Sequence, residues 1–384
     1  MSALDNSHMG PFRAYILYGR PLLPLFLRSI KVNESGSDAQ LKLSSISAYK
    51  AWIGGLVFSA CFTALIWLAG PRLQPFLDTL LPDQGASWYY WKLPARDFTT
   101  MFVVWVLYLA HQFSLWAAIH WAQRNLVGRG VPPTRTLNRY NIAALSINAV
   151  FIVLHLVQTQ LWFDGLAQDV PIWTSQYSVI IMLSVTLVIE NQRRGLLLGK
   201  RVGRPFTAAV TAFFRHNHMY VVAWALVYTF WFHPMAVDPQ LLSGFLYMFL
   251  LLTQASLAYT YVHLDRRWIV VLESYVAVHA FIVALYNTAF FNSPDMWPMF
   301  FGGFAFMFVF TYLYALGVRR EVRWLITGVY VAFLAWLYAP APFGLGRPTT
   351  NLLRLEFLWI PIVLYGLAVA FAAVAYLFIK DRSG

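Results

Sequence analysis

The sequence contains few charged residues. Asp, Glu, Lys and Arg together make up 11% of its 384 residues, whereas soluble globular chains carry about 25%. The hydrophobic fraction is 59%, the aromatic fraction is 18%, and the mean hydropathy is +0.58. This composition excludes a soluble enzyme, a disordered chain and a coiled coil, and it predicts a polytopic membrane protein.

Cysteine and the familiar catalytic motifs are nearly or entirely missing. The single cysteine, Cys61, excludes a disulfide framework, a Cys-x-x-Cys redox pair and a cysteine-based zinc or iron–sulfur site within this chain. There is no Gly-x-Gly-x-x-Gly run, no P-loop, no His-Glu-x-x-His and no paired acidic motif of the prenyl-transfer kind. The sequence therefore predicts no metal site and identifies no cofactor.

What the sequence does contain is a series of ten apolar segments. A bilayer crossing takes about 20 apolar residues, and the fifth and ninth segments are shorter than that. We predict an all-α bundle of about ten membrane-spanning helices, formed by residues 50–384 as a single domain. The segments run over 51–70, 99–121, 140–163, 172–190, 219–233, 240–262, 268–289, 297–317, 324–339 and 357–379.

Basic residues are distributed unequally among the connections. If the connections alternate sides, the side that carries the N-terminus holds 23 of the 28 lysine and arginine residues. Such a bias predicts that both termini are cytoplasmic and that the protein is multi-pass in a plasma membrane, in particular a bacterial inner membrane. It also explains the net charge of +12 without a nucleic-acid partner. The expected partners are membrane lipids, whose anionic headgroups meet the basic residues. A protein partner or a homo-oligomer stays open.

Three segments outside the apolar runs have a distinct composition. Residues 1–49 are predicted to form a cytoplasmic N-terminal segment, in which 15–30 lies in the membrane interface and 33–40 is a polar linker. On the opposite side, the connection over 71–98 contains an aromatic cluster at 88–91, which is typical of an interfacial belt. That connection and the one over 339–356 are the candidate outer lids.

Polar residues follow one face of the third segment. Asn141, Asn148 and His155 are spaced by seven residues, with Gln158 and Thr159 about one turn further. Seven residues are nearly two helical turns, so these side chains form one slowly drifting stripe. We expect the stripe to face other helices or a wet cavity rather than lipid. Interhelical hydrogen bonds and a lined cavity are both consistent with it.

Ionisable residues within membrane segments are costly to bury and often mark a functional site. His111 lies at the centre of the second segment, and the seventh segment carries both Glu273 and His279. We expect the catalytic or transport residues to converge on one internal cavity: His111, His155, Glu273 and His279. The predicted substrate-binding residues are Asn148, Gln158, Tyr108 and Ser114.

Four functions are compatible with this set. The first is an integral membrane enzyme that acts on a lipid or lipid-linked substrate with histidine as general base. The outer aromatic connection and the interfacial segment favour this function, because both can gate a lipid-accessible cavity. The second is a proton-coupled transporter, in which His and Glu exchange protons along the stripe. The third is a haem-binding redox subunit with histidine axial ligands. The fourth is a non-catalytic membrane scaffold subunit.

A short stretch resembles the bacterial membrane acyltransferases. Arg215 precedes a helix that ends in His233, and Ser243-Gly244-Phe245-Leu246 follows. Those enzymes also have a similar number of helices, but their His-bearing helix comes first, whereas here it is the fifth. The resemblance therefore implies acyl transfer as one form of the lipid-enzyme hypothesis and does not assign the family.

The charge distribution predicts that the C-terminal residue is cytoplasmic. A fluorescent reporter that matures only in the cytoplasm should be bright when fused after Gly384, and a periplasmic phosphatase fused there should be inactive. The same two reporters fused within the connection at 339–356 should give the opposite result. An active phosphatase after Gly384 would contradict ten crossings.

Overall fold

The computed structural model describes residues 46–80, 91–291 and 296–381, with side chains in those ranges except at 287–291 and 380–381. The predicted interfacial segment over 15–30, the linker over 33–40 and part of the aromatic cluster at 88–91 lie outside these ranges. Within them the fold is all-α, and no strand is present. The prediction of an all-α fold is confirmed for this part of the chain.

Each of the ten predicted apolar segments contains a long helix. Two short helices, α3 (Gln74–Leu77) and α12 (Thr349–Leu353), lie in the connections. The long helices are α2 (Ala48–Ala69), α4 (Phe98–Ala122), α5 (Arg139–Trp162), α6 (Trp173–Arg194), α7 (Ala208–Phe232), α8 (Pro239–Ser256), α9 (Arg266–Phe291), α10 (Trp297–Phe310), α11 (Arg320–Tyr338) and α13 (Trp359–Asp381).

Seven stretches in the described part of the chain are long and apolar enough to cross a membrane, and they contain α2, α4, α5, α6, α9, α10 and α13. The chain is therefore a multi-pass membrane protein. Helices α7, α8 and α11 do not belong to this set. Ten crossings and cytoplasmic termini remain predictions.

Several helices begin at a polar residue that caps the first turn. The carboxylate of Asp97 accepts a hydrogen bond from the Thr100 N–H at 2.8 Å, and Asn138 forms a reciprocal capping box with Asn141 at the start of α5. These side chains satisfy backbone N–H groups that have no partner inside a helix. The cap on α5 fixes the position from which its polar stripe starts.

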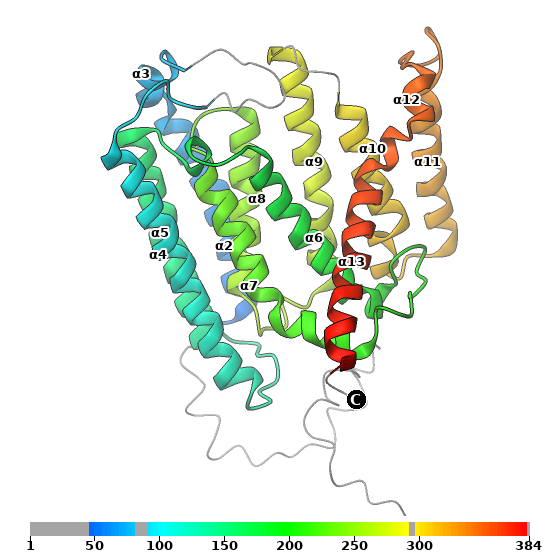
Figure 1. The fold of residues 1–384 in the computed structure, drawn as a ribbon, viewed down its shortest axis with the longest axis horizontal. Coiled ribbons are helices and arrows are strands. Elements are labelled where there is room, and N and C mark those ends of the chain that lie inside the picture. Colours follow the sequence, from blue (N-terminus) through cyan, green and yellow to red (C-terminus); the bar gives the residue numbers. More distant parts are fainter. Residues whose placement is uncertain (1–45, 81–90, 292–295, 382–384) are drawn as a thin grey trace, which may run out of the picture.

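The helices form two groups with separate hydrophobic cores. The first core is built mainly from α2, α4, α5, α7 and α8, and the second mainly from α6, α9, α10 and α13. Helix α6 packs along α7, and α8 packs on α9, so these contacts join the two groups. Figure 1 shows α4 and α5 on one side of the molecule, with α10, α11 and α13 on the other.

Three connections meet at one end of the bundle. The N–H of Ala48 donates to the Arg135 carbonyl at 2.8 Å, and the N–H of Tyr261 donates to the Thr134 carbonyl at 3.1 Å. The start of α2, the α4–α5 connection and the α8–α9 connection are therefore adjacent. In Figure 1 the α4–α5 connection and the end of α13 lie at one end of the bundle, and α3 and α12 lie at the other.

A buried ion pair joins the two helices α6 and α9. Both terminal nitrogens of Arg194 donate to the carboxylate of Glu273, at 2.5 and 2.7 Å, and the guanidinium lies 4.9 Å from the centroid of the Tyr312 ring. The neighbouring Arg193 pairs separately with Glu190 at 2.6 Å. Glu273 thus holds the end of α6 against α9.

Removing one partner of the buried pair should destabilise the protein. Glu273→Gln leaves the buried Arg194 guanidinium without the carboxylate charge that it contacts, which costs about 3–5 kcal/mol in the free energy of unfolding. The matched control is Glu190→Gln, which removes the more exposed pair with Arg193 and should cost less than about 1 kcal/mol. Unfolding of purified protein in mixed detergent micelles measures both. Equal losses in the two variants would contradict the structural role of Glu273.

Candidate functional site

The polar stripe on α5 is turned entirely inward. Asn141, Asn148, His155 and Gln158 have exposed fractions of 0%, 5%, 0% and 1%, respectively, and Thr159 is also buried. The prediction that this face avoids lipid is confirmed. Each member of the stripe bonds a different part of the surrounding bundle.

The first part of the stripe holds the end of α8. The amide nitrogen of Asn141 donates to the carbonyls of Ser256 and Ala258, both at 2.8 Å, and the hydroxyl of Tyr140 donates to the carbonyl of Ala255 at 3.0 Å. The last carbonyls of a helix have no partner within the helix. Residues of α5 therefore cap the C-terminal end of α8.

The middle of the stripe connects four helices through His111. The amide nitrogen of Asn148 donates to Ser256 Oγ at 2.8 Å, and its oxygen accepts from His111 Nε2 at 2.8 Å. Trp231 Nε1 donates to His111 Nδ1 at 3.2 Å. One donated and one accepted hydrogen bond match a neutral imidazole with its proton on Nε2. His111 therefore joins α4, α5 and α7, and Asn148 extends the contact to α8.

His155 has a different arrangement, because both ring nitrogens face acceptors. Nδ1 lies 3.0 Å from Gln158 Oε1, and Nε2 lies 2.9 Å from the carbonyl oxygen of His233. The orientation of the Gln158 amide follows from its other end, because Nε2 donates to the Asp164 carbonyl at 3.1 Å. A neutral imidazole has one N–H, so it satisfies one of the two acceptors.

The stripe continues beyond α5 to an ion-paired cluster at the end of the bundle that carries α3. Arg96 pairs with the fully buried carboxylate of Asp164 at 2.8 Å and also with Asp169, and Trp105 donates to Asp169 at 2.6 Å. Burial raises the pKa of the Asp164 carboxyl, although the hydrogen bond and charge of Arg96 act in the opposite direction. This cluster connects the α5–α6 connection to the start of α4.

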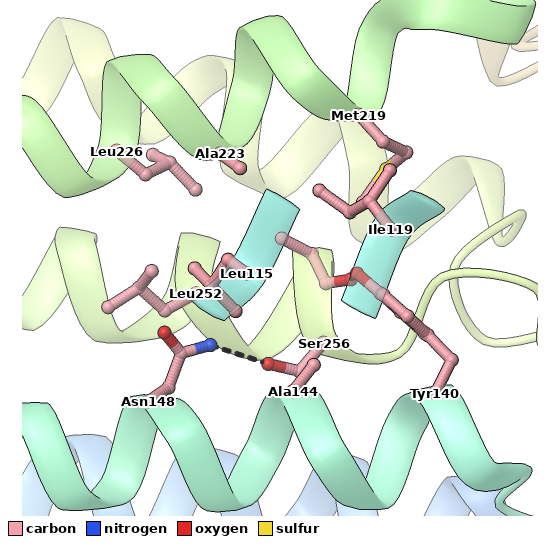
Figure 2. Close-up of a pocket in the computed structure, with 11 residues that line it drawn as sticks. Leu115, Ile119, Tyr140, Ala144, Asn148, Met219, Ala223, Leu226, Leu252 and Ser256 are labelled. Atoms are coloured by element: carbon pink, nitrogen blue, oxygen red, sulfur yellow. Dashed lines mark hydrogen bonds between the residues drawn. The ribbon is translucent and has the colours of Figure 1, made fainter. Parts of the chain in front are cut away.

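A small cavity lies beside Asn148 and Ser256 (Figure 2). Tyr140 also lines it, and the opposite wall is formed by apolar residues such as Met219 and Leu226. Its volume of about 10 Å³ leaves room for about one water molecule. Among the predicted substrate-binding residues, Asn148 lines this cavity.

The remaining predicted substrate-binding residues lie elsewhere. Gln158 bonds His155 and the Asp164 carbonyl. Tyr108 packs edge-on against Trp105 and Tyr228. The predicted set of four therefore does not line one cavity. The fourth member, Ser114, is half-buried.

The four predicted catalytic residues form three sets of contacts. His111 and His155 are neighbours around Trp231, whose ring centroid lies 4.3 Å from that of His155. Glu273 is held by Arg194, and His279 Nδ1 lies 2.9 Å from Ser243 Oγ on α8. None of these hydrogen bonds joins one set to another in the described part of the chain, although His233 interacts electrostatically with both His155 and His279. Convergence on one cavity stays a prediction.

The sequence did not predict several partners in the hydrogen-bond network that is formed by the α5 stripe, His111 and the residues that bond them. Trp231, Ser256 and Asp164 contribute essential partners, but each lies on another helix or in a connection, and none belongs to a periodic pattern. Tryptophan and serine are common in membrane helices, and Asp164 comes directly after α5, where a loop residue is expected. Their roles follow from helix packing alone.

The hydrogen bonding of His111 and His155 does not fit haem ligation. Both nitrogens of His111 and both of His155 are within hydrogen-bond distance of protein groups, whereas an axial ligand needs a nitrogen directed at the iron. Across residues 46–80, 91–291 and 296–381, no group of three or more His, Cys, Asp or Glu side chains is placed to hold a metal ion.

Comparisons with known proteins give no relatives. No family model, no curated protein and no solved structure matches this chain. The function must therefore be argued from the geometry of the network.

The bond between Asn148 and Ser256 should contribute measurably to stability. Interhelical hydrogen bonds in membrane proteins contribute about 0.6 kcal/mol on average and up to about 1.7. A double-mutant cycle with Asn148→Ala and Ser256→Ala, measured by unfolding in mixed micelles, should give a coupling energy in this range. Pairing Asn217→Ala with Ser256→Ala is the control, because Asn217 bonds its own helix, and its coupling should be close to zero. Equal coupling in both cycles would contradict the network.

Proposed function

We propose that this chain is a proton-coupled membrane transporter in which buried histidines of the α5 network accept and release protons. The observation that carries the proposal is the position of His155 between two acceptors, Gln158 Oε1 and the His233 carbonyl. A plasma-membrane location, which the charge distribution predicts, agrees with such a role.

The two acceptors beside His155 offer a hydrogen-bond partner to each ring nitrogen of the protonated form, while burial opposes its charge. In the neutral state the ring donates to only one of these two oxygens, whereas the imidazolium donates to both. Hydrogen bonds to a charged donor are stronger than neutral ones, so they offset part of the cost of burying the charge. No carboxylate contacts the ring, and a fixed ion pair that would trap the proton is therefore missing from the described contacts of His155.

Polar groups extend from His155 in both directions. Toward the α3 end, Gln158 leads to Asp164 and its ion pair with Arg96. Toward the other end, Trp231 lies between His155 and His111, and Asn148 and Ser256 lead to the small cavity. From residue 141 to residue 158 the stripe covers about 26 Å of helix at 1.5 Å per residue, which is most of a hydrocarbon core of about 30 Å.

The two-core architecture also supports a transporter. Many transporters work by moving one helix group against another around a fixed site. Here the histidine network belongs to the group with α4, α5, α7 and α8. The second group packs on it through the contacts of α6 with α7 and of α9 with α8. The lipid-enzyme hypothesis has less support, because its predicted site places Glu273 and His279 in one cavity with His111 of α4 and His155 of α5.

A proton-flux assay tests the proposal. Purified protein is reconstituted into vesicles that contain a pH-sensitive dye, and a potassium gradient with valinomycin drives protons inward. We expect faster acidification than in protein-free vesicles and a loss of at least about tenfold with His155→Gln, since one tenfold step corresponds to about 1.4 kcal/mol in the barrier. Glutamine retains hydrogen-bonding capacity and cannot carry the proton. The matched control is His120→Gln on the exposed face at the end of α4.

A second measurement addresses His155 directly. Nitrogen NMR of protein labelled at histidine, with His155→Gln used to assign the signal, should show a cationic ring as the pH is lowered from 8 to 5. A neutral ring throughout, together with vesicles that acidify no faster than empty ones, would contradict the proposal and favour the scaffold function. Altered lipids in a mass spectrum of the same vesicles would favour the enzyme.

A further inference from the structure

An open groove lies in the second helix group, away from the histidine network. It runs between α9 and α10 and reaches the turn that follows α10. Its volume of about 570 Å³ falls within the range of about 300–1,000 Å³ that is usual for ligand sites. Its walls are mostly apolar, with Arg267, Ser274 and Tyr275 as the polar groups. We propose that this groove binds one anionic phospholipid, with an acyl chain along its floor and the phosphate at Arg267.

The apolar part of the groove suits a lipid tail. Helix α9 from Arg266 to Tyr286 is one of the candidate membrane spans, so hydrocarbon is the medium against this surface. Val271 and Val278 lie seven residues apart on the same face of α9, and their exposed fractions are 52% and 49%. With Phe308 of α10 they form an apolar wall. A tail lying there would cover surface that the protein itself leaves open.

The charge at one end of the groove suits a phosphate. Arg267 is exposed in the first turn of α9, and its guanidinium forms no ion pair with the residues that the structure describes. It lies at the end of the helix that the charge distribution places in the cytoplasm, where anionic headgroups concentrate. Basic pockets between membrane helices on that side bind anionic headgroups.

Ser274 provides a second polar contact deeper in the groove. Its Oγ is buried and has no hydrogen-bond partner within the described part of the chain. A buried hydroxyl without a partner costs free energy. Ser274 follows Arg267 by seven residues, which puts it on the same face about 10 Å further along the helix. The ester carbonyls of a phospholipid lie below its phosphate, so the Ser274 hydroxyl is placed to donate to one of them.

Native mass spectrometry of the full chain in detergent tests the site, with phosphatidylglycerol and phosphatidylcholine as the added lipids. Phosphatidylglycerol should bind more tightly. Arg267→Gln should weaken its binding about fivefold, the factor expected for one basic residue near the membrane surface, and should leave phosphatidylcholine unchanged. The matched control is Arg320→Gln, since Arg320 is exposed in the first turn of α11 and does not line the groove.

Two further variants separate the parts of the proposal. Ser274→Ala should weaken the binding of both lipids to the same extent, because both carry ester carbonyls. Val278→Trp should fill the groove from an exposed position and reduce the occupancy of both lipids. Equal binding of the two lipids to the unaltered protein, or equal losses in Arg267→Gln and Arg320→Gln, would overturn the proposal. Displacement of the lipid by soluble glycerol phosphate would show a site for free phosphate instead. Proton flux through His155 is independent of these outcomes.

Discussion

The structure depends on one constraint, which is that the polar stripe on α5 must find its partners away from lipid. The helix carries amide and imidazole groups at roughly every second turn, and hydrocarbon offers them no hydrogen bonds. The bundle supplies the partners in turn: the end of α8 for Asn141, His111 for Asn148, and the α5–α6 connection for Gln158. The hydrogen bonds that these α5 side chains require therefore fix the positions of α4, α7 and α8 around the helix.

The buried ionisable groups differ in what their surroundings allow. Glu273 forms an ion pair with Arg194 through two short hydrogen bonds, and an aromatic ring lies beside the guanidinium. Such a pair stabilises the contact between the two helices but leaves the carboxylate bound to its partner. His111 has one donor and one acceptor, which a neutral ring satisfies completely. His155 alone among these three faces two acceptors, so its hydrogen bonding improves when it gains a proton. The buried ionisable groups of this bundle therefore include both an ion-paired carboxylate and histidines that are hydrogen-bonded to neutral groups.

The inward orientation of the α5 stripe was predictable, and the meeting of the four ionisable residues was not. Spacing by seven determines which side chains share a face within one helix, and an apolar environment forces that face inward. Periodicity carries no information on how far neighbouring helices rotate or which depths align. His279 accordingly meets Ser243 on α8, and Glu273 meets Arg194 on α6, although all four residues lie within predicted apolar segments.

The sequence by itself determined that this protein is helical, apolar and multi-pass, and it determined which face of α5 is buried, because these properties depend on composition and on contacts within single segments. Only the tertiary structure decided that α6 packs on α13 as well as on its neighbour α7, that Glu273 is committed to an ion pair with Arg194, and that His155 lies between two acceptors. The contacts of His155 with the His233 carbonyl and of Arg194 with Glu273 join residues 78 and 79 positions apart along the chain, which only helix packing brings within hydrogen-bond distance.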